Sequence, residues 1–309
     1  MNTKKCTLLL AIVSIFCLSA LQSRESPAYI TNHEEVDGHL KHVKTQVELR
    51  WKAFAKNKTF PAFQPGKSDD ELRAEFLAIR ETREAIWKKP EYKVAKHLIK
   101  AKRVRHDGCV AFAYNNTVGD FNASTLFLGN RPYIACEGPK YKHLESFFSL
   151  LHTLKSTHIV RLTDAAEGDK IKCHAYWKKH VVRAADGKKH LHAPTKTGIH
   201  KVHAFDIAEW KDNQGIDPKR LLDVALQVKK ELEATNGRLT VHCSAGVGRT
   251  GTFLAALAII DAIDANEPFS ICEIVYRLSL QRIFSVSTPT QYITLHRMAE
   301  IYTPEKNRN

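Results

Sequence analysis

Cys243 and Arg249 stand at the two ends of a short loop of small residues within the stretch Val241 to Gly251. Gly246 and Gly248 inside this loop can adopt backbone angles that are closed to other residues, so the N–H groups of the loop can point toward one centre. A helix that begins near Arg249 adds the positive end of its dipole to that centre. A phosphate dianion fits such a centre, and the same field favours the thiolate form of Cys243. The loop therefore predicts attack on phosphorus by a cysteine.

The side chain of Arg249 provides a second means of holding a phosphoryl group. Its planar guanidinium can make two parallel charge-assisted bonds to phosphoryl oxygens, which strengthen as charge redistributes in the transition state. Thr250 is expected to give its hydroxyl to the sulfur of Cys243. The predicted substrate-binding residues of this stretch are Ser244, Ala245, Gly246, Val247, Gly248 and Arg249.

Two other interpretations of this stretch are weaker. A lone cysteine in a tight strand-to-helix turn is more often a buried structural residue, but the spacing of cysteine, glycines and arginine argues against that here. A nucleotide-type phosphate loop is disfavoured because the Gly-Lys-Ser/Thr ending of such loops is absent. No cysteine pair has the C-x-x-C spacing of a zinc or thioredoxin-like site, so neither a metal nor a cofactor is expected.

The elements that must position this loop follow the pattern of an α/β fold. Residues 238–242 form a short β-type run that ends at the cysteine, and residues 253–263 are almost wholly apolar, which is typical of a buried helix. The ligand sites of α/β folds lie at the carboxyl ends of strands. Further strands are predicted upstream, at 125–128, 133–135, 158–162 and 181–183, with a helix at 143–154.

The N-terminal part of the chain predicts a helical extension. Ser68 and Glu71 have the spacing of a capping box, apolar residues follow at helical spacing, and Pro90 ends the run. Residues 24–66 are polar with scattered aromatics and are expected to be loosely structured. We therefore divide the chain into a signal peptide (1–23), a helical extension (24–100) and a catalytic domain (101–303).

The first 23 residues have the pattern of a signal peptide. Lys4 and Lys5 precede an apolar run from Cys6 to Leu21, and small residues suggest cleavage after Ser23. An uncleaved membrane anchor is the alternative, since the run is close to the lower limit for a bilayer span. No later stretch is long enough to span a membrane. The expected location is therefore secreted or periplasmic.

The 309-residue chain is strongly basic, with a formal net charge of +14. Such a charge suits an anionic partner, but no groove-reading or aromatic-interleaved motif supports nucleic acid, which is not expected as a partner. Five cysteines follow the signal segment, at positions 109, 136, 173, 243 and 272. Because the number is odd, at least one thiol is expected to stay free, and Cys243 is the candidate. A free thiol outside the cytoplasm is exposed to oxidation.

The stretch around Cys243 resembles the protein tyrosine phosphatase family, whose signature is His-Cys, five residues, then Arg-Ser/Thr; His242 supplies the histidine. Other segments resemble further family motifs: Phe121-Asn122-Ala123-Ser124, Tyr133-Ile134-Ala135 with Gly138-Pro139, and Lys172-Cys173 with Tyr176-Trp177. They cover about residues 100 to 302 in family order. The resemblance implies a fold with a twisted mixed sheet flanked by helices. It also implies that the chain belongs to the tyrosine-specific branch and hydrolyses phosphotyrosine through a phosphocysteine intermediate.

The resemblance also implies the residues that move a proton. Trp210-Lys211-Asp212 stands where the family has Trp-Pro-Asp, so Asp212 resembles the general acid, with Asp206 as the alternative if the register is wrong. Lys211 replaces the family proline, and one extra residue lies before Gly215, so the loop is expected to be more mobile. Counting back from Lys172 places Glu167 where the family has the glutamate that pairs with the signature arginine.

Two further positions depart from the family pattern. Residues 286–292 resemble Val-Gln-Thr-x-x-Gln-Tyr, whose glutamines handle water, but Ser287 replaces the first and only Gln291 remains. His106 stands where a tyrosine stacks on the substrate ring, and an imidazole can stack with less area.

Two alternative functions stay open on the sequence. Inositol-phosphate or phosphoinositide phosphatases of the same superfamily are also basic, but such substrates call for lysines in the loop, and residues 244–248 carry no cation. The departures from the family pattern at Lys211, His106 and Ser287 would suit a catalytically weak module that binds phosphate. The presence of Cys243 and Arg249 argues against this alternative. The oligomeric state is not determined by the sequence.

Overall fold

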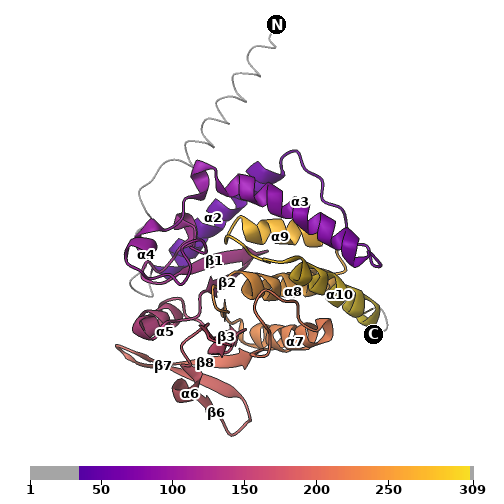
Figure 1. Cartoon of the computed structure of the whole chain (residues 1–309). Helices are drawn as coiled ribbons and strands as arrows, with labels where there is room; N and C mark the ends of the chain where they lie inside the picture. The colour runs from indigo at the N-terminus through magenta and orange to yellow at the C-terminus, as the bar shows by residue number, and fades with distance from the viewer. Residues whose placement is uncertain (1–34, 307–309) are drawn as a thin grey trace.

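The computed structural model describes residues 35–306, so the expected signal segment lies outside the described residues. Its centre is a seven-stranded sheet in the order β1-β2-β9-β3-β8-β7-β6 (Figure 1). The strands are β1 (Ala123–Leu128), β2 (Arg131–Cys136), β3 (His158–Arg161), β6 (Val181–Arg183), β7 (Lys189–Thr195), β8 (Gly198–Asp206) and β9 (Leu239–His242). The predicted strands are present, and β7 and β8 are two further strands of this sheet that the sequence pattern did not indicate.

Four neighbouring strands of the sheet, β2, β9, β3 and β8, run parallel to one another. β9 pairs with β2 on one side and with β3 on the other, and β3 pairs with β8. In register, His242 lies opposite both Cys136 and Arg161, and Arg161 lies opposite Asp206. The carboxyl ends of these strands therefore meet at one edge of the sheet, which is where α/β folds place ligand sites.

Helices cover both faces of this sheet, because the strands carry apolar side chains on each. On one face, α5 (Leu144–Thr153) contributes Phe147, Leu150 and Leu151 to a core with Ile159 of β3. On the other face lie α7 (Pro218–Thr235), α8 (Gly248–Asp264) and α10 (Pro289–Lys306) (Figure 1). The mixed sheet flanked by helices confirms the predicted α/β class.

Helix α8 is buried on nearly all sides, as its almost wholly apolar sequence predicts. It follows β9 directly through the Cys243 loop and packs against α7, α9 (Ile271–Ser279) and α10. The loop therefore joins two elements of the core, and this fixes both of its ends.

The predicted N-terminal helix is α3 (Asp69–Trp87). The Ser68 hydroxyl accepts the backbone N–H of Glu71, and the Glu71 carboxylate accepts the backbone N–H of Ser68, so the capping box is confirmed. Phe76 and Ile79 of α3 enter the same core as α8 and α10. Helix α3 is thus joined by a shared core to the part of the chain that carries the Cys243 loop.

The expectation that residues 24–66 are loosely structured is wrong for the described part. Residues Val36–Ala55 form the 20-residue helix α2. Its buried residues include Val43 and Val47, which pack with Phe127 of β1. The Arg50 guanidinium lies 3.8 Å from the centre of the Tyr114 ring. The apolar face of α2 is narrow and partly formed by a cation–π contact, so the sequence pattern looked polar.

The remaining elements are short. They are α4 (Lys96–Lys100), α6 (Trp177–His180), the hairpin of β4 (Ala166–Glu167) and β5 (Lys170–Ile171), and the 3₁₀ turns Pro90–Tyr92, Ala113–Asn115 and Tyr141–His143. Within residues 35–306, no helix has the length and apolarity that a bilayer span requires. All five cysteines in this range are unpaired.

Candidate active site

The Cys243 loop turns around its own sulfur. The backbone N–H of Gly246 donates a hydrogen bond to Cys243 Sγ at 3.2 Å, and the cysteine side chain is almost fully buried. Gly246 has φ +71°, and a Cβ there would collide with the backbone of Cys136 and Glu137. Glycine is therefore required at this position, because only glycine allows this angle and this close approach to β2.

A buried arginine that sequence reasoning missed supports the loop from the other side. The Arg282 guanidinium donates to the carbonyl oxygens of Gly246 at 2.5 Å and Ala245 at 3.2 Å, and to the Ser124 hydroxyl at 3.0 Å. When carbonyl oxygens are held outward in this way, the N–H groups of the loop are left to face inward. The available signal was a lone arginine in the largely apolar stretch 278–286.

His242 and Thr250, the two signature residues on either side of the loop, differ in their hydrogen bonds. His242 is buried, its Nε2 lies 2.7 Å from the Tyr176 hydroxyl, and burial lowers its pKa to about 3, so the ring is neutral. The predicted bond from Thr250 to the cysteine sulfur is absent: among the described residues, the buried Thr250 hydroxyl has no hydrogen-bond partner. In this structure Gly246, rather than Thr250, donates to Cys243.

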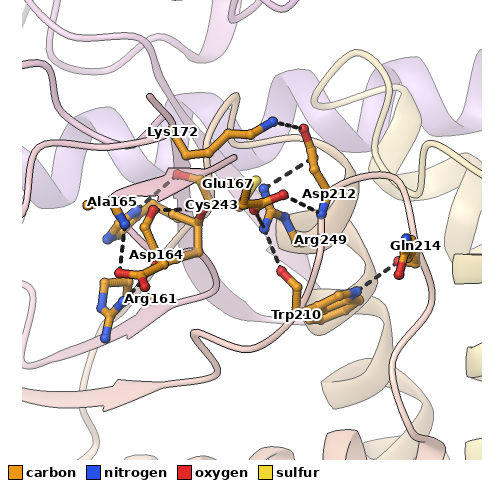
Figure 2. A network of polar contacts seen from close by, with 12 residues as sticks. Arg161, Asp164, Ala165, Glu167, Lys172, Trp210, Asp212, Gln214, Cys243 and Arg249 are labelled. Carbon is orange, nitrogen blue, oxygen red and sulfur yellow. Dashed lines mark hydrogen bonds and ion pairs between the residues drawn. The ribbon is translucent and has the colours of Figure 1, made fainter. Parts of the chain in front are cut away.

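Arg249 is fully buried and is held by a carboxylate and a carbonyl. Its Nη1 donates to Glu167 Oε1 at 2.7 Å and to the Trp210 carbonyl oxygen at 2.6 Å, as Figure 2 shows. Its Nη2 donates to Asp212 Oδ1 at 3.1 Å. Burial lowers the pKa of Arg249, but the charges of Cys243, Asp212 and Glu167 raise it further, so the net shift is upward. The guanidinium is thus permanently charged beside the sulfur.

Asp212 lies next to the Arg249 guanidinium. Its backbone N–H donates to Glu167 Oε2 at 2.9 Å, and its Oδ2 accepts from Lys172 Nζ at 2.5 Å (Figure 2). Burial raises the pKa of Asp212, but the bond from Lys172 and the charge of Arg249 outweigh burial and lower it. The carboxylate can exchange a proton with a group bound at the loop, and its surroundings favour the ionised form.

The segment around Asp212 is tied at several points. Trp210 is buried, and its Nε1 donates to the Gln214 carbonyl oxygen at 2.8 Å. Asn213 adopts the left-handed conformation with φ 58°, so the extra residue of this loop is taken up in a tight turn. Asparagine tolerates this conformation better than most residues, which explains how the loop closes without the family proline.

Asp206 belongs to a different cluster. At the end of β8, its carboxylate contacts Arg161 Nη2 at 3.4 Å and Lys189 Nζ at 2.7 Å. These groups line a cavity of about 180 Å³ beside Trp177. No hydrogen bond or ion pair of the described residues joins Asp206 to Arg249. The geometry therefore favours Asp212 over Asp206 as the acid.

Ser287 and Gln291 lie against the start of α8. A Cβ at Gly248 would stand 2.7 Å from Ser287 Oγ and 3.1 Å from the amide atoms of Gln291. The Ser287 backbone N–H donates to Gln291 Oε1 at 2.8 Å, and its hydroxyl donates to the Phe284 carbonyl oxygen at 2.7 Å. Both side chains thus reach the phosphate-binding loop, and serine leaves more room than glutamine beside Gln291.

His106 is exposed near the same site. Burial lowers its pKa, as does the charge of Arg105, and the opposing influence of Asp212 shows that the ring lies within electrostatic reach of that carboxylate. The segment is anchored by the Arg105 backbone N–H, which donates to Glu137 Oε2 at 3.0 Å. His106 is therefore an exposed residue on a segment that is fixed at Arg105.

The structure brings most of the predicted residues to one edge of the sheet. They are Cys243, the loop 244–248, Arg249, Asp212, Glu167, Lys172, Ser287 and Gln291. This arrangement can bind a tetrahedral dianion, present a sulfur nucleophile to it and exchange one proton with the leaving group.

Comparison with known proteins agrees with this arrangement. The family model described as protein-tyrosine phosphatase matches residues 107–190 and 187–300. The chain belongs to the protein-tyrosine phosphatase family, as its resemblance in sequence predicted.

Curated relatives carry the same family name. The chain is 31% identical over 200 residues to receptor-type tyrosine-protein phosphatase C of Mus musculus, a match that covers 57% of this chain and 15% of that protein. It is 29% identical over 189 residues to receptor-type tyrosine-protein phosphatase alpha of the same organism, covering 55% and 23%. The matched region is therefore a small part of each of these relatives.

Solved structures confirm the fold. A protein tyrosine phosphatase of Trypanosoma brucei has a TM-score of 0.65 at 20% identity, covering 76% of this chain and 92% of that one. The catalytic domain of human protein tyrosine phosphatase non-receptor type 18 has a TM-score of 0.66 at 19% identity, covering 75% and 96%.

Proposed function

We propose that this chain hydrolyses phosphotyrosine in proteins or peptides through a phosphocysteine at Cys243. The observation that carries the proposal is the pairing of a buried sulfur, bonded by the Gly246 N–H at 3.2 Å, with a buried arginine that contacts both Glu167 and Asp212. A structural cysteine would need neither a converging loop nor a charged clamp.

The reaction takes two balanced steps. The Cys243 thiolate attacks phosphorus, the phosphorus–oxygen bond to the leaving group breaks, and Asp212 gives its proton to the departing oxygen. Water then attacks the phosphocysteine, Asp212 takes a proton from it, and the sulfur leaves as thiolate with release of inorganic phosphate. Arg249 and the loop N–H groups stabilise charge on the phosphoryl oxygens in both steps. In this proposal Gln291 orients the water.

Two features support a tyrosyl leaving group. The loop 244–248 offers backbone N–H groups and no lysine, so it provides no extra cation for a polyphosphorylated inositol. His106 stands exposed near Asp212, where its ring can contact an aromatic side chain. The names of the relatives point to the same substrate class.

The decisive experiment compares wild type with Cys243→Ser on phosphotyrosine peptides, phosphoserine peptides and inositol phosphates. Wild type is expected to turn over phosphotyrosine peptides fastest. Cys243→Ser is expected to lose turnover but to bind vanadate, because the loop N–H groups and Arg249 remain. Near-normal hydrolysis by the variant would overturn the nucleophile, and faster release from inositol phosphates would overturn the substrate class. Saturable binding without any turnover in wild type would indicate a binding module.

We also propose that the enzyme is secreted or periplasmic. The support is the charged start at Lys4 and Lys5 followed by the apolar run to Leu21. Sequencing the N-terminus of protein recovered from outside the cytoplasm is expected to find cleavage after Ser23. Protein that stays in the cytoplasm with residue 1 intact would contradict the proposal.

A further inference from the structure

Three histidines form a row across one face of the sheet, far from the Cys243 loop along the strands. His203 of β8 lies in register with His190 of β7 on one side and with His158 of β3 on the other. The ring centres of both neighbouring pairs are 5.4 Å apart. His158 also lies in register with Leu239, at the amino end of β9. The row is therefore at the opposite end of the parallel strands from the catalytic cysteine.

A carboxylate from a helix completes this cluster. Glu231 of α7 places Oε2 3.8 Å from His203 Nδ1. One donor atom from each of His158, His203 and Glu231 lies within 4.8 Å of the other two, and this is the one such group found among residues 35–306. Two imidazoles and one carboxylate are a ligand set that zinc accepts, with water in the fourth position.

One of the three distances between donor atoms is close to that expected around a bound ion. Zinc bonds of about 2.0–2.2 Å in a tetrahedron place neighbouring donor atoms about 3.4 Å apart. The contact from His203 to Glu231 is 3.8 Å, so a change of a few tenths of an ångström in side-chain position suffices there.

A threonine hydroxyl contacts one ring nitrogen of His158 and leaves the other available. Thr157 Oγ1 donates to the Arg238 carbonyl oxygen at 3.2 Å and lies 2.8 Å from His158 Nδ1. In the tautomer in which Nδ1 donates to this hydroxyl, Nε2 has a lone pair available to a metal ion. Such outer contacts are typical of histidine ligands.

A lysine side chain already contacts the carboxylate of this cluster. The Lys188 Nζ contacts both oxygens of Glu231 at 2.8 Å, and the lysine side chain is 41% exposed. An exposed lysine can swing into solvent, whereas the histidines are held by the sheet. Lys188 is therefore a competitor of a metal ion for Glu231.

From this geometry we propose that His158, His203 and Glu231 form a binding site for Zn²⁺ that excludes the catalytic residues. The ion would displace Lys188 and join β8 to α7. In the chain, β8 ends at Asp206 and α7 begins at Pro218, so these two elements precede and follow the segment that carries Asp212. The proposal does not depend on the reaction at Cys243.

The test is titration of Zn²⁺ into the full chain carrying Cys243→Ser, so that the active-site thiolate cannot bind the metal. One ion per chain is expected, with binding weakened at least about tenfold by Glu231→Gln and at least about a hundredfold by His203→Gln. Lys188→Ala is expected to tighten binding, because the competitor is removed. The last variant is exposed and keeps the core intact, so a failure to fold does not confuse its result.

The His152 and His200 pair provides a matched control. Its ring centres are also 5.4 Å apart, but the pair belongs to no carboxylate-containing metal cluster of the described residues. His200→Gln is expected to leave zinc affinity unchanged. Failure of the Cys243→Ser chain to bind Zn²⁺ would overturn the proposal. So would unchanged affinity in both Glu231→Gln and Lys188→Ala, or loss of the bound ion in His200→Gln.

Discussion

Asparagine at position 212 tests the proton donor with little change in shape. Asp212→Asn keeps the backbone N–H that donates to Glu167 at 2.9 Å, and the Arg249 bond to the Trp210 carbonyl oxygen at 2.6 Å also remains. These contacts hold the segment in place. The variant loses the ion pairs to Lys172 at 2.5 Å and Arg249 at 3.1 Å, together with the proton. The expected effect is therefore mainly chemical.

The magnitude follows from the role of the proton. General acid catalysis contributes about 10²–10⁴ in rate, which is about 2.7–5.5 kcal/mol of barrier. A phenolate is a poor leaving group and needs the proton, whereas 4-nitrophenolate leaves largely without it. We expect Asp212→Asn to slow phenyl phosphate by at least about a hundredfold, and 4-nitrophenyl phosphate by a much smaller factor.

Asp206→Asn is the matched control for this experiment. Asp206 is also a partly buried carboxylate in two ion pairs, at 3.4 Å to Arg161 and 2.7 Å to Lys189. Asp206→Asn is expected to leave both rates nearly unchanged, since among the described residues no hydrogen bond or ion pair joins Asp206 to Arg249. The assay measures, for both esters, kcat in the steady state and the rate constant of a single turnover. Equal slowing of the two esters by Asp212→Asn, or leaving-group dependence in Asp206→Asn instead, would refute the assignment.

Two further predictions concern the surroundings of the acid and of the water. Lys172→Met removes a hydrogen bond that helps to lower the pKa of Asp212, so this pKa rises and the protonated acid persists to higher pH. The alkaline limb of the pH profile of kcat/KM for phenyl phosphate is therefore expected to shift to higher pH. An unchanged limb would contradict the link between Lys172 and the acid. Ser287→Gln fills the space beside Gln291. Wild type is therefore expected to transfer phosphate to added glycerol, and the variant is expected to do so much less. An equal ratio of glycerol phosphate to inorganic phosphate in the two proteins would show that the serine has no effect.

The sequence was sufficient for the parts whose local pattern matches their final environment. The capping box at Ser68 and Glu71 predicted the start of α3, because both partners lie within one turn. The run of apolar residues after the Cys243 loop predicted a buried helix, and α8 is buried on nearly every side. In both cases the interactions are short in sequence or depend only on composition.

Other parts depend on contacts between distant residues. Helix α2 was missed because its burial relies on Phe127 and on the ring of Tyr114, which lie far along the chain. Arg282 was missed because its partners are backbone carbonyl oxygens of the loop, which leave no mark on residue type. The resemblance to the family pointed to Glu167, but not to the fact that one carboxylate bonds both Arg249 and the backbone of Asp212.

The position of Glu167 suggests how the acid segment can move without disturbing the clamp. Displacement of this segment breaks the contacts of Arg249 with Trp210 and Asp212, and the bond from the Asp212 backbone to Glu167. The bond between Arg249 and Glu167 at 2.7 Å involves neither moving residue, since Glu167 belongs to the β4–β5 hairpin. A buried arginine left without a partner would be costly, so this bond must persist when the segment departs. We therefore expect the Arg249 side chain to stay oriented for phosphate when Asp212 is displaced.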